Sequence, residues 1–296
     1  MTQKRPGKVF LIINNKAGHG KGQKAAEFII PFLTERGCIV EHAFTQYPGH
    51  ATELALKASA DQFDLVVAIG GDGTANETAQ GLIDTGTTFG IVPIGSGNGL
   101  AREAGISTNI QKACHTLLDG VTRNIDVCRI NNQRFFCTSG IGFDAHIAYE
   151  MSIASTRGFW RYVRLAVMES LFYKPLNVKI KIDGKPFDYK AFLITFANAS
   201  QYGNNIYIAP GASMSDGLLD VVIVKPFKKI LLPVFGLALF FKVVHRLPFV
   251  DCYKATDIEL DWTDTSAFHF DGELGKLELP ERISIDPGKL FIRCGE

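Results

Sequence analysis

The stretch Asp64-Leu-Val-Val-Ala-Ile-Gly-Gly-Asp-Gly-Thr-Ala-Asn-Glu-Thr78 joins an apolar run to a helical pattern through a glycine-rich turn. Residues 65–69 are apolar and β-prone, and the apolar spacing from Ala75 to Ile83 predicts a helix directly after the turn. Glycine lets backbone N–H groups approach an anion, and a helix N-terminus favours the negative charge. The same turn also fits a structural interpretation, in which glycine only satisfies the turn geometry. The rest of the chain has to decide between the two.

Asp72 is the unusual member of this turn. A carboxylate in a phosphate cradle repels its ligand unless a cation or a proton lies between them, and Mg²⁺ is a common cation at nucleotide phosphates. The turn therefore points to a nucleotide phosphate with Mg²⁺.

Two further glycine turns follow apolar strand patterns. The strand at 8–13 ends in the turn 14–22, which carries Lys16 and Lys21, and the strand at 89–94 ends in the turn 95–99. Alternating strands and helices predict a parallel α/β sheet, and in such sheets ligands bind beyond the carboxyl ends of the strands. We therefore expect the three turns to gather at one edge. None has the Walker A or Gly-x-Gly-x-x-Gly sequence, which weighs against a P-loop NTPase and an ordinary dehydrogenase.

The pattern changes after Arg129. Short strand-like segments are divided by turns that include Asp-Gly pairs at residues 183, 216 and 271, which is typical of an antiparallel sandwich or barrel. Two stretches, 147–173 and 228–244, look helical. The predicted fold is an α/β nucleotide-binding domain at residues 1–128, joined by a C-terminal segment at about 287–296, and an antiparallel β-sandwich domain at residues 129–286. The last strand, near residues 290–293, is expected to cross back to the first domain.

Composition excludes several classes of protein. A net charge of +1 gives no general reason to expect a nucleic-acid partner. Six scattered cysteines without a Cys-x-x-Cys pair predict buried thiols in a reducing compartment. The polar N-terminus predicts no signal peptide. The longest apolar run, 230–241, is interrupted by Pro233 and falls well short of the roughly 20 residues of a membrane span. A cytoplasmic protein is expected.

Five motifs, taken in order, resemble those of the diacylglycerol kinase catalytic family, which includes bacterial soluble lipid kinases and the sphingosine and ceramide kinases. The motifs are Gly70-Gly71-Asp72-Gly73-Thr74-x-Asn76-Glu77, Pro93-x-Gly95-Ser96-Gly97-Asn98, Gly140-x-Gly142-Phe143-Asp144-Ala145, Asp216-Gly217-Leu218 and Asp271-Gly272-Glu273. The resemblance covers almost the whole chain. It implies a nucleotide domain related to phosphofructokinase and NAD kinase, followed by a β-sandwich. The implied activity is ATP- and Mg²⁺-dependent phosphorylation of a primary lipid hydroxyl, such as that of diacylglycerol or a sphingoid base.

The resemblance also implies roles for individual residues. Glu273 would be the catalytic base, and Asp72 and Asp126 would belong to a charge network that holds the catalytic Mg²⁺. A structural Mg²⁺ site is implied at Ser213, Asp216 and Leu218. The residues expected to bind ATP are Asn14, Lys16, Gly18, Thr45, Gly70, Gly71, Asp72, Gly73, Thr74, Asn76, Ser96 and Asn98.

One position departs from the family pattern. Many bacterial members carry an acidic residue where this chain has Gly99, and the Gly-Ser-Gly-Asn string is closer to the sphingosine and ceramide kinase version. The carboxylate network would then lack one member, and the identity of the acceptor lipid is less well defined.

Taken by themselves, several of these residues have a structural alternative. The Asp-Gly turn before Glu273 is also the commonest hairpin signal. Asp126 lies in an apolar strand, where a buried carboxylate needs either hydrogen bonds or a cation. Asp144 is a candidate for binding the polar head of the acceptor, or for capping the helix that follows it. Three histidines have no carboxylate partner at short spacing, so structural or capping roles are expected for His50, His146 and His269.

Two segments with basic and apolar residues are candidates for membrane contact. Residues 225–246 have basic ends and an apolar middle, and residues 157–164 alternate arginines with aromatic residues. Each fits either an interfacial segment or a core helix. Because a lipid kinase has to reach its substrate at a membrane surface, peripheral contact through at least one of them is expected. A homodimer through an exposed edge strand is permitted but not required.

Two other functions compete with a lipid kinase. NAD kinase shares the Gly-Gly-Asp-Gly-Thr string, although the motifs at residues 216–218 and 271–273 favour the lipid kinase. A lipid- or nucleotide-binding sensor without turnover is the third interpretation, prompted by Gly99.

Overall fold

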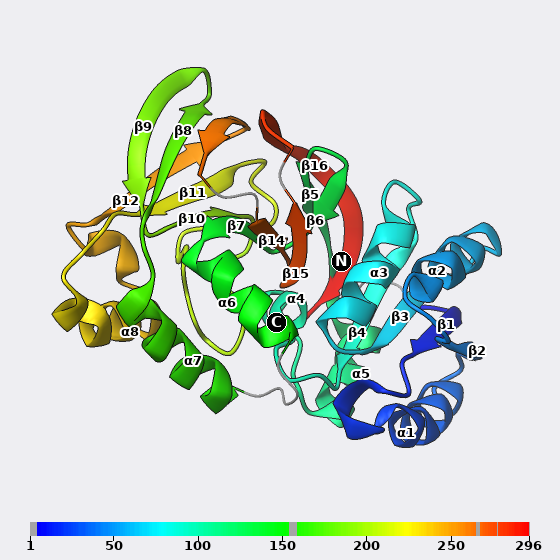
Figure 1. Cartoon of the computed structure of the whole chain (residues 1–296). Coiled ribbons are helices and arrows are strands. Elements are labelled where there is room, and N and C mark those ends of the chain that lie inside the picture. Colours follow the sequence, from blue (N-terminus) through cyan, green and yellow to red (C-terminus); the bar gives the residue numbers. More distant parts are fainter. Residues whose placement is uncertain (1–4, 154–158, 265–266, 277, 296) are drawn as a thin grey trace. The chain divides into compact units, whose positions relative to one another are not determined.

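The computed structural model describes residues 5–153, 159–264, 267–276 and 278–295 (Figure 1). Its internal contacts divide the chain into two compact units, Met1–Ile125 with Gly288–Glu296, and Asp126–Pro287. The sequence-based boundaries lay after residues 128 and 286. Two long strands, β5 (Val121–Ile130) and β16 (Glu281–Cys294), contribute residues to both units.

The first unit is built on a parallel sheet with the order β2-β1-β3-β4-β16. Ile292 of β16 pairs with Phe89, so the last strand returns to this sheet as expected. All residues of β3 are buried, which is typical of a central parallel strand covered on both faces. The strands are β1 (Lys8–Ile13), β2 (Ile39–Phe44), β3 (Leu65–Gly70) and β4 (Thr88–Pro93).

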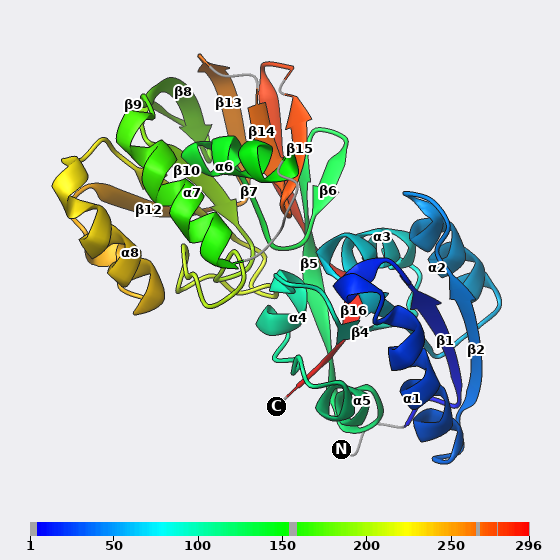
Figure 2. The ribbon, with the colours of Figure 1, turned by 60° about the horizontal axis from the view of Figure 1, so that its bottom comes forward.

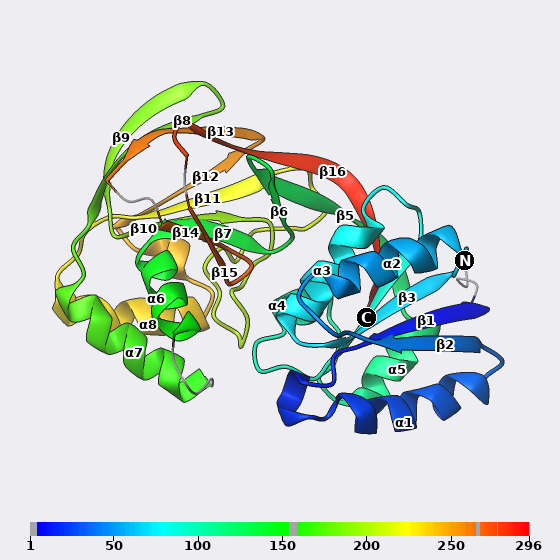
Figure 3. The ribbon, with the colours of Figure 1, turned by 45° about the vertical axis from the view of Figure 1, so that its right-hand side comes forward.

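Helices cover both faces of the parallel sheet. Helices α2 and α3 pack together on one face, and α1 and α5 lie on the other (Figure 3). The helices of this unit are α1 (Gly22–Thr34), α2 (His50–Ala60), α3 (Asp72–Leu82), the short α4 (Gly99–Glu103) and α5 (Ile110–Asp119).

The second unit is a sandwich of two antiparallel sheets. One contains β16, β13, β8 and β9, and the other has the order β12-β11-β10-β7-β14-β15. Alternate residues of β10 serve two cores: Ile194 and Phe196 face the space between the sheets, and Leu193 and Ala197 face a second cluster shared with helices. The predicted α/β domain and antiparallel β-sandwich are both confirmed.

The remaining strands are β6 (Gln133–Phe135), β7 (Thr138–Gly142), β8 (Leu176–Ile182), β9 (Lys185–Ala191), β10 (Leu193–Ala197), β11 (Leu219–Val224), β12 (Val250–Ala255), β13 (Asp257–Thr263), β14 (Ala267–Phe270) and β15 (Glu273–Lys276). The sequence patterns did not indicate β9 and β12. Both are edge strands, and β9 alternates mainly exposed and half-buried residues. An edge strand needs less apolar sequence than a central strand, so its signal is weak.

Three helices lie on the outer side of the six-stranded sheet (Figure 2): α6 (Phe143–Ser152), α7 (Phe159–Phe172) and α8 (Leu232–Phe240). They confirm the helical patterns expected in the second unit, and the 3-10 turns η2 (Lys229–Leu231) and η3 (Val244–Arg246) flank α8. Residues 157 and 158 of the arginine-aromatic stretch lie outside the described residues. None of the helices described is both long enough and apolar enough to cross a membrane.

The cysteines differ in one respect from the expectation. All six are free thiols, and five are buried, but Cys252 on β12 is exposed. β12 is an edge strand whose middle residues alternate between half-buried and exposed, and Cys252 is one of the exposed ones.

Candidate active site

The three glycine turns of the first unit contact one another backbone to backbone. A Cβ atom on Gly95 would lie 2.6 Å from the Cα of Gly71, and one on Gly18 would lie 2.5 Å from the carbonyl oxygen of Ile94. Both distances are shorter than real Cβ atoms tolerate, so no side chain fits at these two positions. The turns that follow β1, β3 and β4 therefore gather at the carboxyl ends of these strands, as expected from the sequence.

Asp72 ties two of these turns together. Its Oδ2 accepts a hydrogen bond from the N–H of Asn98 at 2.8 Å, and its Oδ1 accepts one from the N–H of Gly99 at 2.6 Å. A Cβ atom on Gly97 would lie 2.7 Å from Oδ2, so the approach also requires glycine there. Position 99 thus takes part through its backbone, and the carboxylate of Asp72 holds the third turn against the first turn of α3.

Other polar side chains in this region shape the turns. The side-chain amide of Asn98 accepts from the N–H of Gly95 at 3.1 Å and donates to its carbonyl oxygen at 2.8 Å. Asn14 donates to Oγ1 of Thr74 at 3.0 Å and accepts from the N–H of Lys16 at 3.0 Å. These side chains bind protein groups, so the surface offered to a ligand is made mainly of backbone and of exposed residues such as Gly73 and Ser96.

This edge fits a nucleotide phosphate with Mg²⁺. Turns that exclude side chains bring backbone amides close to an anion, and α3 begins directly beneath them with Gly71 as its N-cap. Mg²⁺ is commonly held by one or two carboxylates together with substrate phosphates. Asp72 supplies a carboxylate here, and each of its oxygens can accept more than the single amide bond seen for it.

Asp126 anchors the loop that carries the predicted structural metal ligands. The residue is 2% exposed, its Oδ2 accepts from the N–H of Gly217 at 2.8 Å, and its own N–H donates to the carbonyl oxygen of Met214 at 2.7 Å. The bond from the N–H of Gly217 is of the kind that a buried carboxylate needs, which is one of the two arrangements expected from the sequence.

Within that loop, Asp216 already has a cationic partner. Its Oδ2 lies 2.9 Å from Nζ of Lys254, and its Oδ1 accepts from the N–H of Leu218 at 3.1 Å. Partial burial acts to lower the pKa of Lys254, but the carboxylates of Asp216 and Asp220 outweigh it and raise that pKa. Among the residues described, no three His, Cys, Asp or Glu side chains are placed to hold a metal ion. In the predicted set Ser213, Asp216 and Leu218, the single carboxylate is paired with Lys254, which would compete with a cation for it.

In the second unit, Asp271 and Gly272 form a tight hairpin turn between β14 and β15. Their φ angles of 48° and 85° are the two positive values of a type I′ turn. The carboxylate of Asp271 accepts backbone N–H groups from Phe136, Cys137 and Thr138 at 2.8 to 3.0 Å. Burial raises the pKa of Asp271, and these hydrogen bonds act against that rise. Glu273 is exposed at the first position of β15. The motif is thus a hairpin turn. The hydrogen bonds of Asp271 hold this turn in place, and Glu273 follows directly after it.

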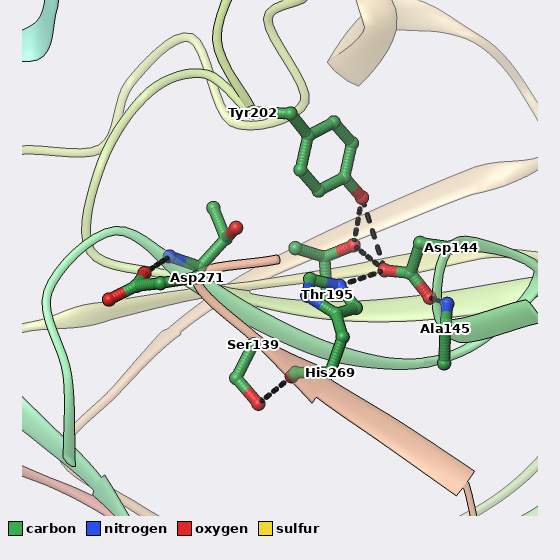
Figure 4. A network of polar contacts seen from close by, with 8 residues as sticks. Ser139, Asp144, Ala145, Thr195, Tyr202, His269 and Asp271 are labelled. Atoms are coloured by element: carbon green, nitrogen blue, oxygen red, sulfur yellow. Dashed lines mark hydrogen bonds and ion pairs between the residues drawn. The ribbon is translucent and has the colours of Figure 1, made fainter. Parts of the chain in front are cut away.

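Asp144 is the centre of a buried polar network. Figure 4 shows Tyr202, Thr195 and His269 pointing toward its carboxylate. Its Oδ2 lies 3.0 Å from Oγ1 of Thr195, 3.2 Å from the hydroxyl of Tyr202 and 3.2 Å from Nε2 of His269. The side chains of Asp144 and His269 are only 7% and 5% exposed. The alternative that Asp144 caps a helix is wrong, because the N-cap of α6 is Gly142 and Asp144 lies in the first turn.

Sequence reasoning missed this network and with it the environment of His269. Asp144 and His269 are separated by 125 positions, and no local pattern links them. Nδ1 of His269 is buried without a hydrogen-bond partner among the described atoms, whereas the carbonyl oxygen of His269 accepts from Oγ of Ser139 at 2.7 Å. The other two histidines also have local structural contacts: His146 pairs with Glu169 at 3.0 Å, and Nδ1 of His50 accepts from the N–H of Gln46.

The fold and the glycine turns define a parallel α/β unit suited to phosphate binding, followed by a β-sandwich. The sequence profile described as "Diacylglycerol kinase catalytic domain" matches residues 8–130, and the one described as "YegS C-terminal NAD kinase beta sandwich-like domain" matches residues 138–294. The chain therefore belongs to the family of the diacylglycerol kinases and YegS-like lipid kinases.

Similar proteins carry names from the same family. The chain is 34% identical to a diacylglycerol kinase of Bacillus subtilis, over 73% of each chain. It is 31% identical to a diacylglycerol kinase of Mycobacterium tuberculosis, over 88% of this chain and 82% of the relative. The crystal structure of a putative diacylglycerol kinase from Bacillus anthracis superposes with a TM-score of 0.82 over 99% of this chain and 97% of that one, at 24% identity. That last likeness shows the fold.

Proposed function

We propose that this chain is an ATP- and Mg²⁺-dependent lipid kinase that phosphorylates a primary hydroxyl of a lipid such as diacylglycerol or a sphingoid base. The observation that carries the proposal is the contact between the glycine turns, where Gly95 and Gly18 approach neighbouring backbone too closely for any side chain. The names of the similar proteins, diacylglycerol kinases and a probable lipid kinase, support the choice of acceptor.

In the first unit, we assign nucleotide binding to the turns after β1, β3 and β4. The backbone amides of these turns would hold the phosphates. Asp72 would hold the third turn in place through its two hydrogen bonds while its carboxylate faces the cation. Mg²⁺, when bound, neutralises charge on the phosphate oxygens. Thr45, whose N–H donates to the carbonyl oxygen of Ile13, and Asn76 of α3 would line the same edge.

In the second unit, we assign proton removal to Glu273 and acceptor positioning to Asp144. An alcohol has a high pKa, so a carboxylate has to accept its proton as the new bond to phosphorus forms. Glu273 is an exposed carboxylate on a tight turn, and Asp271 fixes that turn through three backbone N–H groups. Asp144 is ordered by Thr195, Tyr202 and His269, which suits a group that orients a hydroxyl.

The decisive experiment compares Glu273→Gln with the nearby exposed Glu278→Gln. We expect Glu273→Gln to lower labelled-phosphate transfer from ATP to a lipid panel by about 10²- to 10⁴-fold, the usual contribution of a general base. Binding of ATP should stay nearly unchanged, and Glu278→Gln should behave as the wild type. Wild-type turnover in Glu273→Gln would remove Glu273 from the mechanism.

The same assay separates the competing functions. NAD included as an acceptor tests the NAD-kinase alternative, and transfer to NAD but to no lipid would replace the proposal. ATP consumption with no acceptor phosphorylated, or no consumption at all, would favour a binding protein. The alternative of a binding protein was prompted by the glycine at position 99. The N–H of Gly99 donates a hydrogen bond to Asp72, so this position still holds its turn against Asp72 without an acidic side chain.

A further inference from the structure

Helix α7 has two apolar sides, and only one of them is covered. Leu165 and Ala166 pack against the cluster that also contains residues of α6 and β10. Val167, Met168, Leu171 and Phe172 are exposed, and Phe172 keeps 84% of its accessible surface. Their spacing places the four on one stripe of the helix.

Helix α8 and the turns beside it repeat this arrangement. Phe235 and Ala238 are buried in the same cluster, whereas Val234, Leu237 and Phe240 of α8 are exposed, as are the flanking Ile230 and Phe241. Ile230 is 82% exposed. The sequence fits either an interfacial segment or a core helix here, and the structure shows that the helix is only half covered. We call the exposed apolar residues of α7 and of 230–241 the α7–α8 face.

The two halves of this face belong to one layer. Helices α7 and α8 lie side by side in the views of Figures 1, 2 and 3, and the ammonium of Lys229 donates a hydrogen bond to the carbonyl oxygen of Ser170 on α7. The same ammonium lies 4.8 Å from the ring centroid of Phe192, and burial lowers the pKa of Lys229. An exposed apolar surface with polar surroundings is typical of a docking site.

The exposed charged residues of 225–246 and of α7 are basic. Residues 225–246 contain lysines or arginines at 225, 228, 229, 242 and 246 and no aspartate or glutamate. Lys228, Lys242 and Arg246 are exposed, as are Arg161, Arg164 and Lys174 around α7. The acidic residue of α7, Glu169, pairs with His146. The surroundings of the apolar face therefore attract an anionic surface.

We propose that the α7–α8 face docks on an anionic lipid bilayer, with the apolar side chains in the interfacial region and the basic residues against the headgroups. The inference rests on the proposed function, since a lipid kinase meets its acceptor in a membrane. A second copy of the chain is a poorer occupant, because a two-fold interface would place two basic surfaces against each other.

The layer also connects the face to the candidate acceptor residues. Phe143 precedes Asp144 and packs in the same cluster as Phe235, and Leu193 and Ala197 of that cluster flank Thr195 on β10. The helices that would rest on the bilayer therefore pack directly on the elements that carry the Asp144 network.

The test measures co-sedimentation of the full chain with vesicles of phosphatidylcholine alone and of phosphatidylcholine with phosphatidylglycerol. Wild type should bind the anionic vesicles, less so at high salt. The double variant Phe172→Asp/Ile230→Asp should bind them at least about tenfold more weakly, because each change removes a large side chain from the apolar contact. The matched control, Ile39→Asp/Leu56→Asp, changes two exposed apolar residues of the first unit and should bind as the wild type does.

A second variant and a second acceptor separate docking from chemistry. Lys228→Glu/Arg246→Glu should reduce binding to anionic vesicles while leaving the apolar residues in place. Both face variants should phosphorylate a short-chain, water-soluble acceptor at the wild-type rate and lose transfer to a long-chain acceptor in vesicles.

Unchanged vesicle binding in both face variants would overturn the docking proposal, whether or not the chain is a kinase. A dimer in sedimentation velocity that Phe172→Asp/Ile230→Asp dissociates would overturn it in favour of a second copy. Vesicle binding that depends on the face, without phosphorylation of any lipid, would support docking and reject the proposed function.

Discussion

The glycine turns of the first unit and the Asp144 network of the second unit are built on opposite principles. The turns are made of backbone, with Gly95 against Gly71 and Asp72 bonded to the N–H groups of Asn98 and Gly99. The network is made of side chains that reach Asp144 from separate strands and loops. A turn packed backbone against backbone tolerates no added side-chain atom. A network of side chains tolerates a substitution that keeps its hydrogen bonds, but not the loss of a hydrogen-bond partner.

This contrast makes the glycine turns the most sensitive region. Gly95→Ala would place a Cβ 2.6 Å from the Cα of Gly71 and 2.9 Å from Oδ1 of Asn98, so the turns have to separate. Because displacements of about 1 Å can cost about 100-fold in rate, we expect at least that loss in phosphate transfer. Gly211→Ala is the matched control, since a Cβ there meets nothing within 4 Å. Equal steady-state rates for the two variants would contradict this account of the turns.

The two Asp-Gly hairpins of the second unit offer a sharper comparison of a half-buried and an exposed aspartate. Asp271 and Asp183 both have positive φ and both accept backbone N–H groups, but Asp183 is exposed. Asp271→Ala would leave three N–H groups without their acceptor and should lower the free energy of unfolding by about 3 kcal/mol. Asp183→Ala should cost less, since water can replace the lost acceptor. Urea unfolding of both variants measures the difference.

The decreases in unfolding free energy caused by Asp271→Ala and Asp183→Ala should depend on pH in opposite directions. Burial raises the pKa of Asp271, so the stability linked to this group is present at acid pH and declines as the pH rises through the raised pKa. For Asp183, burial is outweighed by hydrogen bonds from Asp257 and Thr256, which lower its pKa, so its contribution is present at neutral pH and lost on acidification. With rising pH, the difference in unfolding free energy between wild type and Asp271→Ala should thus become smaller. The difference between wild type and Asp183→Ala should become larger. Parallel trends would be inconsistent with these environments.

The Asp144 network should respond more mildly to an isosteric change. In Asp144→Asn, an amide group would replace one carboxylate oxygen, and rotation can still offer the carbonyl to Thr195 or Tyr202. We expect a loss of about 1–2 kcal/mol in unfolding free energy. A role in positioning the acceptor further predicts a higher KM for lipid with the KM for ATP unchanged. A change in stability with both KM values intact would limit Asp144 to a structural role.

The smallest expected effect concerns Lys254 and the predicted metal loop. Lys254→Met removes the ion pairs of Lys254 with the partly exposed Asp216 and with the buried Asp220, which should lower the free energy of unfolding by about 1 kcal/mol. If Ser213, Asp216 and Leu218 bind Mg²⁺, the rise in Tm caused by Mg²⁺ should be larger in Lys254→Met than in wild type. Asp216→Asn should abolish that rise. An identical Mg²⁺ response in all three proteins would remove the metal from this loop.

Much of the second unit could not be predicted because its decisive contacts are distant in sequence. The residues that hold Asp271 lie more than 130 positions before it, and His269 finds Asp144 across 125 positions. The edge strands β9 and β12 were missed because exposed edges need little apolar sequence. The exposure of Phe172 and Ile230 could not be predicted either. An apolar helix has the same sequence pattern whether its outer side is buried or exposed to solvent.

The sequence by itself determined the order of elements, the two fold classes and the positions of the glycine turns. These features depend on local chain geometry: a strand, a turn with glycine and a helix N-terminus follow one another within a few residues, as at Gly70 to Thr74. Only the tertiary structure decided what each carboxylate binds. Asp72 bonds the N–H groups of a neighbouring turn and Asp216 meets Lys254, because a charged group selects its partner by proximity in the folded chain, which spacing along the sequence does not encode.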